Sequence, residues 1–196
     1  DTKTLVDVVT LGQGVQLPLN WYHPDLPWSI NLPHVFDPKT AAAELEAAGL
    51  VDSDGNGIRE FNGADTAFGI LCDVNSPVEI RATELIAGWL KDVGIGTHRI
   101  CQDIDLSVAQ IWPNFVAVPN PDYDMAIWGW SAVPQFRRGF VRFMTNCDFG
   151  DGNGWANLTG ICDKKFDDLI AQFVSNPDPS KTEDLAKQIQ ESIAAN

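Results

Sequence analysis

The hydrophobic and polar positions along the chain follow two kinds of pattern. Over residues 77–93 apolar side chains recur at i, i+3 and i+4, which is the spacing of an amphipathic helix. Residues 66–72 and 95–101, on either side of this helix, are short apolar runs typical of buried strands. The order strand, helix, strand predicts a βαβ unit with parallel strands and a right-handed crossover.

Capping residues predict where two of the helices begin. Asp37 is a good N-cap, and Pro38 suits the first helical position, where its missing N–H group costs nothing. The helix that follows is expected to run to about Ala48. Ser76 and Glu79 have the spacing of a capping box at the start of the helix within the βαβ unit.

The remaining pattern completes the predicted fold. We expect a helix over 2–11 and a long ordered loop over 15–36. After the βαβ unit we expect a short helix over 105–112, a buried strand over 123–130, a helix over 136–144 and a Gly/Asn/Asp-rich loop over 145–162. Two helices end the chain, of which one carries Phe166, Leu169, Ile170 and Phe173 and the other starts at Asp178-Pro179. The fold class is therefore α/β, with a central mixed sheet that contains the parallel βαβ unit and is flanked by helices. We expect residues 1–196 to form a single domain.

Composition and charge narrow the function. The 196 residues are 44% hydrophobic and 20% charged, which is a globular composition. The formal net charge of -14 argues against a nucleic-acid partner and against an anionic membrane surface. No nucleophile motif, carboxylate pair or phosphate-binding loop stands out, so we expect no enzyme and no cofactor. Since Asp1 opens directly into a helical pattern, we expect a processed chain or a piece of a longer one.

The segment DSDGNGIRE has part of a calcium-binding pattern. Asp52, Asp54 and Asn56 occupy the first, third and fifth positions of an EF-hand loop, and Glu60 offers further oxygen ligands. The twelfth position, which needs a bidentate Glu, is Gly63. This mismatch favours an Asx-rich turn between a helix and a strand, with calcium as the second interpretation.

Two tryptophans mark a candidate binding surface. Trp128 and Trp130 lie at the end of a predicted strand, and ligands of open α/β sheets bind outside the carboxyl ends of strands. Because alternate residues of a strand face the same side, the two indoles can share one wall of a cleft, or can both belong to the core. Arg137, in the following loop, is a candidate partner for a ligand carboxylate, or for an acidic side chain of this chain.

The four cysteines are Cys72, Cys101, Cys147 and Cys162, and none belongs to a CxxC motif. An even number favours two disulfides and an oxidising compartment, while four buried thiols remain the alternative. Cys72 and Cys101 both fall at the carboxyl ends of neighbouring predicted strands. A bond between these two cysteines is therefore geometrically reasonable.

Taken in order, the motifs resemble a known family. DTKTLVDVVTLGQG, WYHPDLP, DPKTAAAELEAAGL, DSDGNGIRE, SPVEIRATELIAGWLKDVGI, YDMAIWGW, NLTGICDKKFDDLI and AKQIQESI are similar, in sequence and in order, to segments of the family 5 extracytoplasmic solute-binding proteins of ABC transporters. This family includes peptide-, oligopeptide- and nickel-binding members. The resemblance covers nearly the whole chain.

The resemblance implies a function and a set of partners. Family members are longer and enclose a ligand between two lobes, and this chain resembles the carboxyl-side lobe. We therefore expect a substrate-binding component that captures a peptide or other small solute and delivers it to a membrane permease. The implied partners are the missing N-terminal lobe, the solute and the permease. The implied location is periplasmic or extracellular, and the full-length protein is a candidate for a lipid anchor.

The resemblance also bears on particular residues. Dipeptide-binding members carry a disulfide in the position of Cys147 and Cys162. Peptide-binding members place an Asp after the Trp-rich strand to bind the peptide's amino group, and here Ser131 and Ala132 stand in that place. This departure disfavours a peptide ligand with a free amine. The rival interpretations are a calcium-stabilised carbohydrate-binding module, a hydrolase with the same fold, and a sensor lobe without a transport role.

Overall fold

The computed structural model describes residues 1–16, 25–26, 28–112, 122–129, 147–148, 157 and 162–195. Contacts within the chain divide it into two compact units. The first unit comprises residues 1–15, 35–107 and 122–128, and the second comprises residues 16–34, 108–121 and 129–196. That the whole chain forms a single domain stays a prediction.

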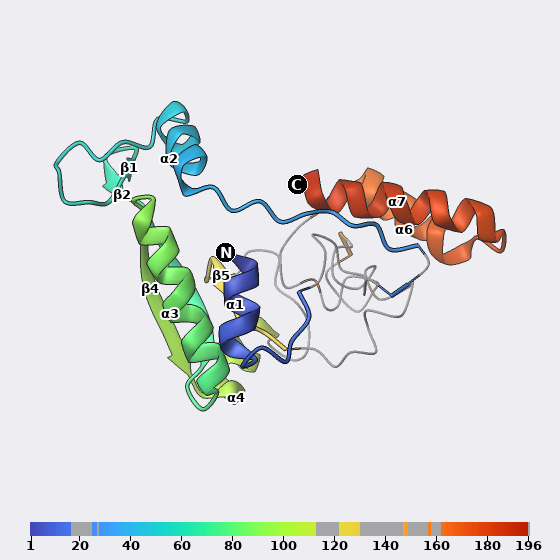
Figure 1. Ribbon diagram of the computed structural model, residues 1–196, viewed down its shortest axis with the longest axis horizontal. Helices are drawn as coiled ribbons and strands as arrows, with labels where there is room; N and C mark the ends of the chain where they lie inside the picture. Colours follow the sequence, from blue (N-terminus) through green and yellow to red (C-terminus); the bar gives the residue numbers. More distant parts are fainter. Residues whose placement is uncertain are drawn as a thin grey trace. The chain divides into compact units, whose positions relative to one another are not determined.

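A small parallel sheet lies at the centre of the first unit (Figure 1). Its strands are β3 (Ala67–Asp73), β4 (Gly96–Gln102) and β5 (Met125–Ala126), in the order β4-β3-β5, and both pairings are parallel. Helix α3 (Pro77–Asp92) connects β3 to β4 and packs against both strands. The predicted βαβ unit and the α/β class are confirmed. The core of this unit is centred on β3, where Ile70, Leu71 and Cys72 are each at most 1% exposed.

The other helices and strands described within residues 1–112 are shorter than α3. They are α1 (Thr2–Val9), α2 (Pro38–Ala47), the antiparallel pair β1 (Glu60–Phe61) and β2 (Ala64–Asp65), and α4 (Ile104–Ile111), which begins soon after β4. Asn62 and Gly63 join β1 to β2 with φ angles of 54° and 80°. A two-residue hairpin turn of type I′ needs positive φ at both central positions, which Asn-Gly adopts readily. None of the described helices is long and apolar enough to cross a membrane.

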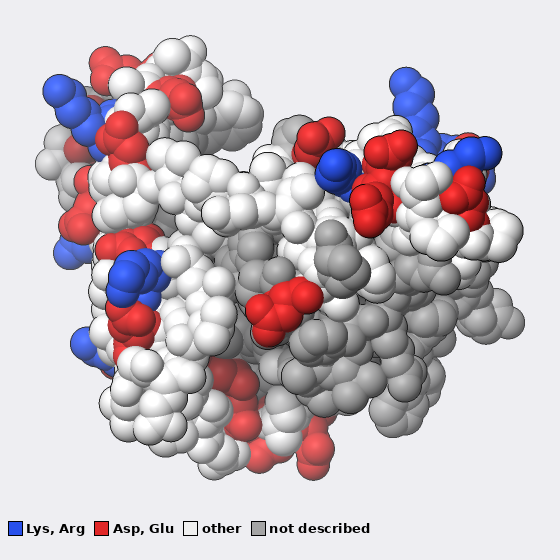
Figure 2. Space-filling view, turned by 45° about the vertical axis from the view of Figure 1, so that its right-hand side comes forward, with Lys and Arg blue, Asp and Glu red and all other residues white. Residues whose placement is uncertain are grey.

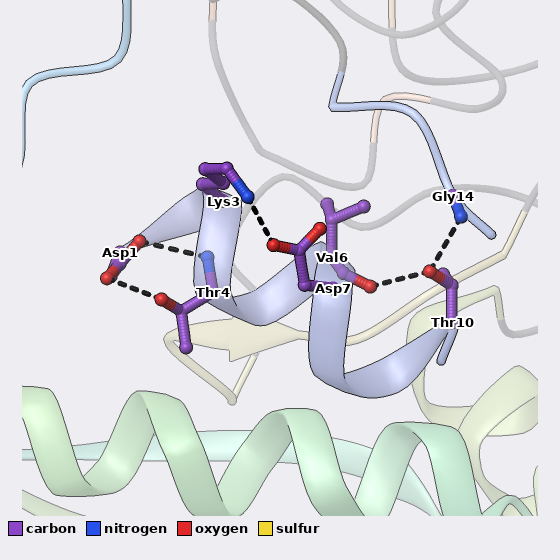
Figure 3. A network of polar contacts seen from close by, with 7 residues as sticks. All are labelled: Asp1, Lys3, Thr4, Val6, Asp7, Thr10 and Gly14. Atoms are coloured by element: carbon purple, nitrogen blue, oxygen red, sulfur yellow. Dashed lines mark hydrogen bonds and ion pairs between the residues drawn. The ribbon is translucent and has the colours of Figure 1, made fainter. Parts of the chain in front are cut away.

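Helix α1 begins and ends with side-chain hydrogen bonds (Figure 3). The Asp1 carboxylate accepts bonds from the Thr4 amide at 2.9 Å and the Thr4 hydroxyl at 2.7 Å. At the other end, the Thr10 hydroxyl donates to the Val6 carbonyl and accepts from the Gly14 amide, both at 2.7 Å. A Cβ atom on Gly14 would lie only 2.7 Å from the Thr10 side chain, so this turn requires glycine.

The predicted caps of α2 and α3 are present, but the capping box is only half formed. Asp37 caps α2, and the Ser76 hydroxyl accepts a bond from the Glu79 amide at 3.3 Å. The Glu79 carboxylate does not return to Ser76. It accepts instead from the amide of Asp73 at 2.7 Å, which ties the start of α3 to the end of β3. The reason is that Asp73 is the last residue of the strand, where its amide needs an acceptor.

In the second unit, α6 (Lys164–Ser175) packs against α7 (Pro179–Ala195). Their shared core contains Phe166, Ile170, Phe173, Ala186 and Ile189. Both helices were predicted from their apolar spacing and are confirmed. The predicted helix over 136–144 and most of the loop over 145–162 lie outside the described residues.

Candidate functional site

The carboxyl ends of β3 and β4 are joined covalently. Cys72 and Cys101 are register partners in the parallel ladder, with Cα atoms 4.5 Å apart, and form a disulfide. Cys72 is 1% exposed and Cys101 is half-buried, so the bond is largely shielded from solvent. This is the pairing that was expected to be geometrically reasonable, because both cysteines were predicted at the carboxyl ends of neighbouring strands.

Hydrogen bonds continue this connection beyond the strands. The Val74 amide donates to the Gln102 carbonyl at 2.9 Å, and the Asn75 side-chain amide donates to the Asp103 carboxylate at 3.3 Å. The other oxygen of Asp103 accepts from the Asp105 amide at 3.0 Å, which caps α4. The ends of β3 and β4 are thus joined by a disulfide, and the segments that follow them are joined by a main-chain and a side-chain hydrogen bond.

This edge of the sheet combines apolar and acidic groups. Four aliphatic side chains are well exposed there: Val74 at 48%, Val78 at 51%, Ile104 at 38% and Leu106 at 60%. Residues 73–79 and 102–106 include four acidic side chains and no Lys or Arg. The surface can therefore contact apolar groups and accept hydrogen bonds, and it favours a donor or a positive charge over an anion.

On the other side of β3, the chain after β5 reaches the same edge. The Ile127 amide donates to the Leu71 carbonyl at 2.9 Å, and the half-buried Trp128 follows immediately. Among the described residues 122–129, the strand predicted over 123–130 is shorter than expected, since only Met125–Ala126 pair as β5. Trp130, Ser131, Ala132 and Arg137 lie outside the described residues.

Sequence reasoning missed Asn75 and Asp103 as members of this edge. A signal for both was present, because Asn75 follows the first buried strand and Asp103 follows the second. In a parallel βαβ unit these two positions meet at one edge of the sheet.

The second disulfide lies in the second unit and agrees with the resemblance. Cys147 and Cys162 are bonded, with Cα atoms 4.6 Å apart, and all four cysteines of the chain are paired. The Cys147 amide also donates to the carboxylate of Asp167 at 3.1 Å. Asp167 is only 8% exposed and lies in α6. The disulfide loop is therefore tied to this helix by a buried charged acceptor as well as by Cys162.

The DSDGNGIRE segment brings its carboxylates together. Ligand oxygens of Asp52, Asp54 and Glu60 lie within 4.8 Å of one another. The same groups accept bonds from the loop's own backbone, for example Asp52 from the Gly57 amide at 2.9 Å and Glu60 from the Ser53 amide at 2.8 Å. The bond from Ser53 holds the pKa of Glu60 below its ordinary value. This is the geometry of an Asx-rich turn, and a calcium role stays a prediction.

On the face seen in Figure 2, acidic side chains of the described residues are scattered rather than gathered in one patch. This agrees with a chain of net charge -14 that contains 27 acidic and 13 basic side chains. Such a surface repels polyanions in solution. It does not by itself mark any one binding site.

Comparison with known families gives one match that spans most of the chain. The model described as bacterial extracellular solute-binding proteins, family 5 Middle, matches residues 1–151. Among curated proteins, the oligopeptide-binding protein AppA of Bacillus subtilis is 27% identical over 137 residues, which are 67% of this chain.

Solved structures show the same fold over nearly the whole chain. AppA of Bacillus subtilis in complex with a nonapeptide aligns over 99% of this chain with a TM-score of 0.75 and 24% identity. NikA of Brucella suis in complex with Fe(III)-EDTA aligns over 99% of this chain with a TM-score of 0.75 and 22% identity. MelB of Agrobacterium fabrum in complex with stachyose aligns over 99% of this chain with a TM-score of 0.76 and 18% identity.

The chain is much shorter than these proteins. It covers 24% of the curated AppA sequence, 37% of the AppA and NikA structures, and 30% of the MelB structure. The alignments with these solved structures span nearly all of this chain, so they include its parallel sheet and its final pair of helices.

Proposed function

Since this chain belongs to the bacterial extracellular solute-binding proteins of family 5, we propose that it is part of the substrate-binding component of an ABC importer. In this role it captures a peptide or other small solute between two lobes and delivers it to a permease. The observation that carries the proposal is the family match over residues 1–151. The likeness of fold to AppA, NikA and MelB supports it.

The proposed solute site includes the carboxyl edge of the β4-β3-β5 sheet. Ligands of open α/β sheets bind at this edge, and here the two loops beyond β3 and β4 are held in place before any solute arrives. Trp128 follows β5 at the same edge, and Trp130 is proposed to extend its wall. Ser131 and Ala132 are proposed as further contacts in the next loop, and Arg137 as the partner of a solute carboxylate.

The chemistry of the edge favours a class of solute. The exposed aliphatic side chains suit an apolar group, and Asp73 and Asp103 suit a hydrogen-bond donor or an amine. A peptide offers both, with a carboxylate for Arg137. Since Ser131 and Ala132 replace the acid expected after the Trp-rich strand, the amine of such a peptide is proposed to bind toward the β3 and β4 loops instead.

The partners and location follow from the same proposal. The chain would act with a second lobe, which completes the contacts around the solute, and with a membrane permease. It would work in the periplasm or outside the cell, where the two disulfides are stable, with a lipid anchor as a candidate attachment. Neither catalysis nor a cofactor is part of this role.

Native mass spectrometry of the protein isolated from its own host tests the proposal. We expect a bound small molecule that is released on denaturation, and a peptide is the expected class. A Trp128→Leu variant, isolated in the same way, should retain less of it. A protein that carries no solute, and whose melting temperature does not change with peptides, metal chelates or oligosaccharides, would contradict a solute-binding role.

A calcium-stabilised carbohydrate-binding module is the alternative, and the clustered carboxylates of Asp52, Asp54 and Glu60 favour it. The test is the melting temperature of the chain with and without calcium. A calcium-dependent increase that is lost in the combined Asp52→Ala and Asp54→Ala variant would support the alternative. An unchanged melting temperature would remove it.

A further inference from the structure

The carboxylate of Asp124, the residue before β5, binds the middle of the central strand. One oxygen of Asp124 accepts a hydrogen bond from the Gly69 amide at 2.7 Å. The main-chain amide of Asp124 donates to the Gly69 carbonyl at 3.1 Å. Both bonds reach a residue that is 55 positions away in the sequence. Asp124 therefore holds Gly69 by its side chain and by its backbone at once.

This carboxylate occupies the place of a main-chain acceptor. In a parallel ladder, the N–H and C=O groups of a residue that face one neighbour both pair with that neighbour's backbone. Here the Gly69 carbonyl is paired in this way, but the Gly69 amide is paired with a side chain. The pairing of β5 with β3 then continues through Ile70↔Met125 and Leu71↔Ala126. The Asp124 carboxylate thus forms the first rung of this ladder.

The pairing of β5 with β3 is short. The strand has only two residues, and Gly69 offers no side chain to pack against it. The opposite neighbour of Gly69 is His98 on β4, and a Cβ atom on Gly69 would lie 2.8 Å from the His98 ring. Because a side chain is excluded there, the pairing of this segment with Gly69 itself is made by hydrogen bonds. A carboxylate is a stronger acceptor than a neutral carbonyl.

The register of β5 decides where Trp128 lies. A shift of one residue in strand pairing moves each side chain to the opposite face of the sheet. Such a shift would move Trp128 into the place of Ile127, or Ile127 into the place of Trp128, at the carboxyl edge. The bond at the start of β5 therefore controls a side chain four residues further along the chain.

We propose that Asp124 is a positioning residue for the solute site, in which its bond to the Gly69 amide sets the register of β5 and so the place of Trp128. The inference rests on the proposed function only in taking Trp128 as a solute contact. The register itself is a property of the chain without solute, so the two parts are tested separately.

The test uses the chain labelled with 5-fluorotryptophan, with the fluorine resonance of Trp128 assigned from a Trp128→Phe variant. In Asp124→Ala we expect this resonance to move or broaden while those of Trp28 and Trp89 stay in place. Amide hydrogen exchange at Gly69 should become roughly ten-fold faster, since a bond to a charged acceptor is lost. Asp92→Ala, which removes an exposed carboxylate at the end of α3, is the control and should change neither readout.

Asp124→Asn is the conservative variant, because its side-chain oxygen can still accept the bond from Gly69. We expect it to restore the Trp128 resonance of the original chain. Unchanged Trp128 and Gly69 signals in Asp124→Ala would overturn the inference. If Asp124→Ala fails to fold, Asp124→Asn decides alone, and a displaced Trp128 in that variant would overturn the role of the acceptor.

A separate titration addresses the solute. A nonapeptide added to the original chain should shift the Trp128 resonance if Trp128 contacts solute. Absence of a shift with the nonapeptide counts against the proposed function at this residue. The effect of Asp124→Ala on Trp128 is measured without peptide. The role of Asp124 in positioning Trp128 is therefore tested independently of the proposed function.

Discussion

Arg59 connects the ends of two helices at the scale of a single residue. Its guanidinium donates to the Val93 carbonyl at 2.9 Å and to the Leu50 carbonyl at 2.8 Å. These carbonyls lie just beyond α3 and α2, where helices leave acceptors unpaired and favour a positive charge. Arg59 stands at the position of the DSDGNGIRE segment that is hydrophobic in calcium loops. Its bonds give a structural reason for this departure.

Replacing Arg59 by Met should lower the free energy of unfolding by about 1.5–3 kcal/mol, the usual range for hydrogen bonds to a charged group. Arg81→Met is the matched control, since Arg81 forms only an exposed ion pair with Glu84 at 3.2 Å. That change should cost less than about 1 kcal/mol. Urea unfolding measures both, and equal losses in the two variants would refute the assigned role of Arg59.

In the second unit, the side chain of Gln190 likewise connects separate segments of the chain. It is fully buried, its side-chain nitrogen donates to the Trp28 and Ala186 carbonyls, both at 2.8 Å, and its oxygen accepts from the Ile30 amide at 2.9 Å. Each side-chain group thus has a main-chain partner. Two of these partners belong to a segment without helix or strand, which Gln190 attaches to α7.

A Gln190→Leu variant keeps the size of the side chain but leaves the Trp28 carbonyl and the Ile30 amide without this partner. Each group left unpaired should cost about 1–3 kcal/mol of unfolding free energy. Gln188→Leu, two residues away on an exposed part of α7, should change it by less than about 0.5 kcal/mol. A Gln190 variant as stable as the Gln188 variant in thermal or urea unfolding would contradict this assignment.

At the scale of elements, acidic and hydroxyl caps begin most of the described helices. Asp1, Asp37, Ser76 and Asp163 accept bonds from the first free amides of α1, α2, α3 and α6. These bonds are local, which is why the sequence predicted the starts of α2 and α3 so closely. Strand β5 shows the opposite case, because its start depends on Asp124 binding a residue far away in the chain.

The cap of α2 should give the chain a measurable pH dependence. The hydrogen bonds from Thr40, above all that from its hydroxyl, hold the pKa of Asp37 below its ordinary value. A carboxyl group whose pKa is lowered on folding stabilises the folded state at pH values above the ordinary pKa of about 3.9. This contribution is lost as the pH falls through the lowered pKa.

The melting temperature of Asp37→Ala should therefore be below that of the original chain at pH 7, and the difference should shrink as the pH falls below about 3.9. Glu46→Ala, which removes an exposed acid from the last turn of α2, is the control. It should show no such convergence. A difference between Asp37→Ala and the original chain that is the same at pH 7 and at low pH would show that the carboxylate does not act as proposed.

At the scale of the whole molecule, the sequence predicted the architecture better than the site. The order of caps, apolar periods and turns was enough for the βαβ unit and the final helices, because each depends on neighbours in sequence. The site depends on contacts between distant segments. The Asn75–Asp103 bond requires knowing that β3 and β4 are adjacent and parallel. Outside the site, the Gln190 bonds to Ile30 and Trp28 likewise span 160 residues or more.

The two disulfides also differ in how far the sequence alone could predict them. A Cys72–Cys101 bond was geometrically reasonable from the predicted sheet, since both residues were placed at the ends of adjacent strands. Cys147–Cys162 was implied only by the family resemblance, because no local pattern brings these residues together. Both bonds are present, whereas the roles of Trp130, Ser131, Ala132 and Arg137 stay predictions because these residues lie outside the described part of the chain.

The most direct test of the solute site is a titration of the isotopically labelled chain with a nonapeptide, followed by amide chemical shifts. A site at the carboxyl edge predicts the largest changes in residues 73–76, 102–105 and 127–129, with weak affinity because a second lobe supplies the remaining contacts. Changes confined to residues 52–60 or to α6 and α7, or no changes at saturating peptide, would contradict a solute site at this edge.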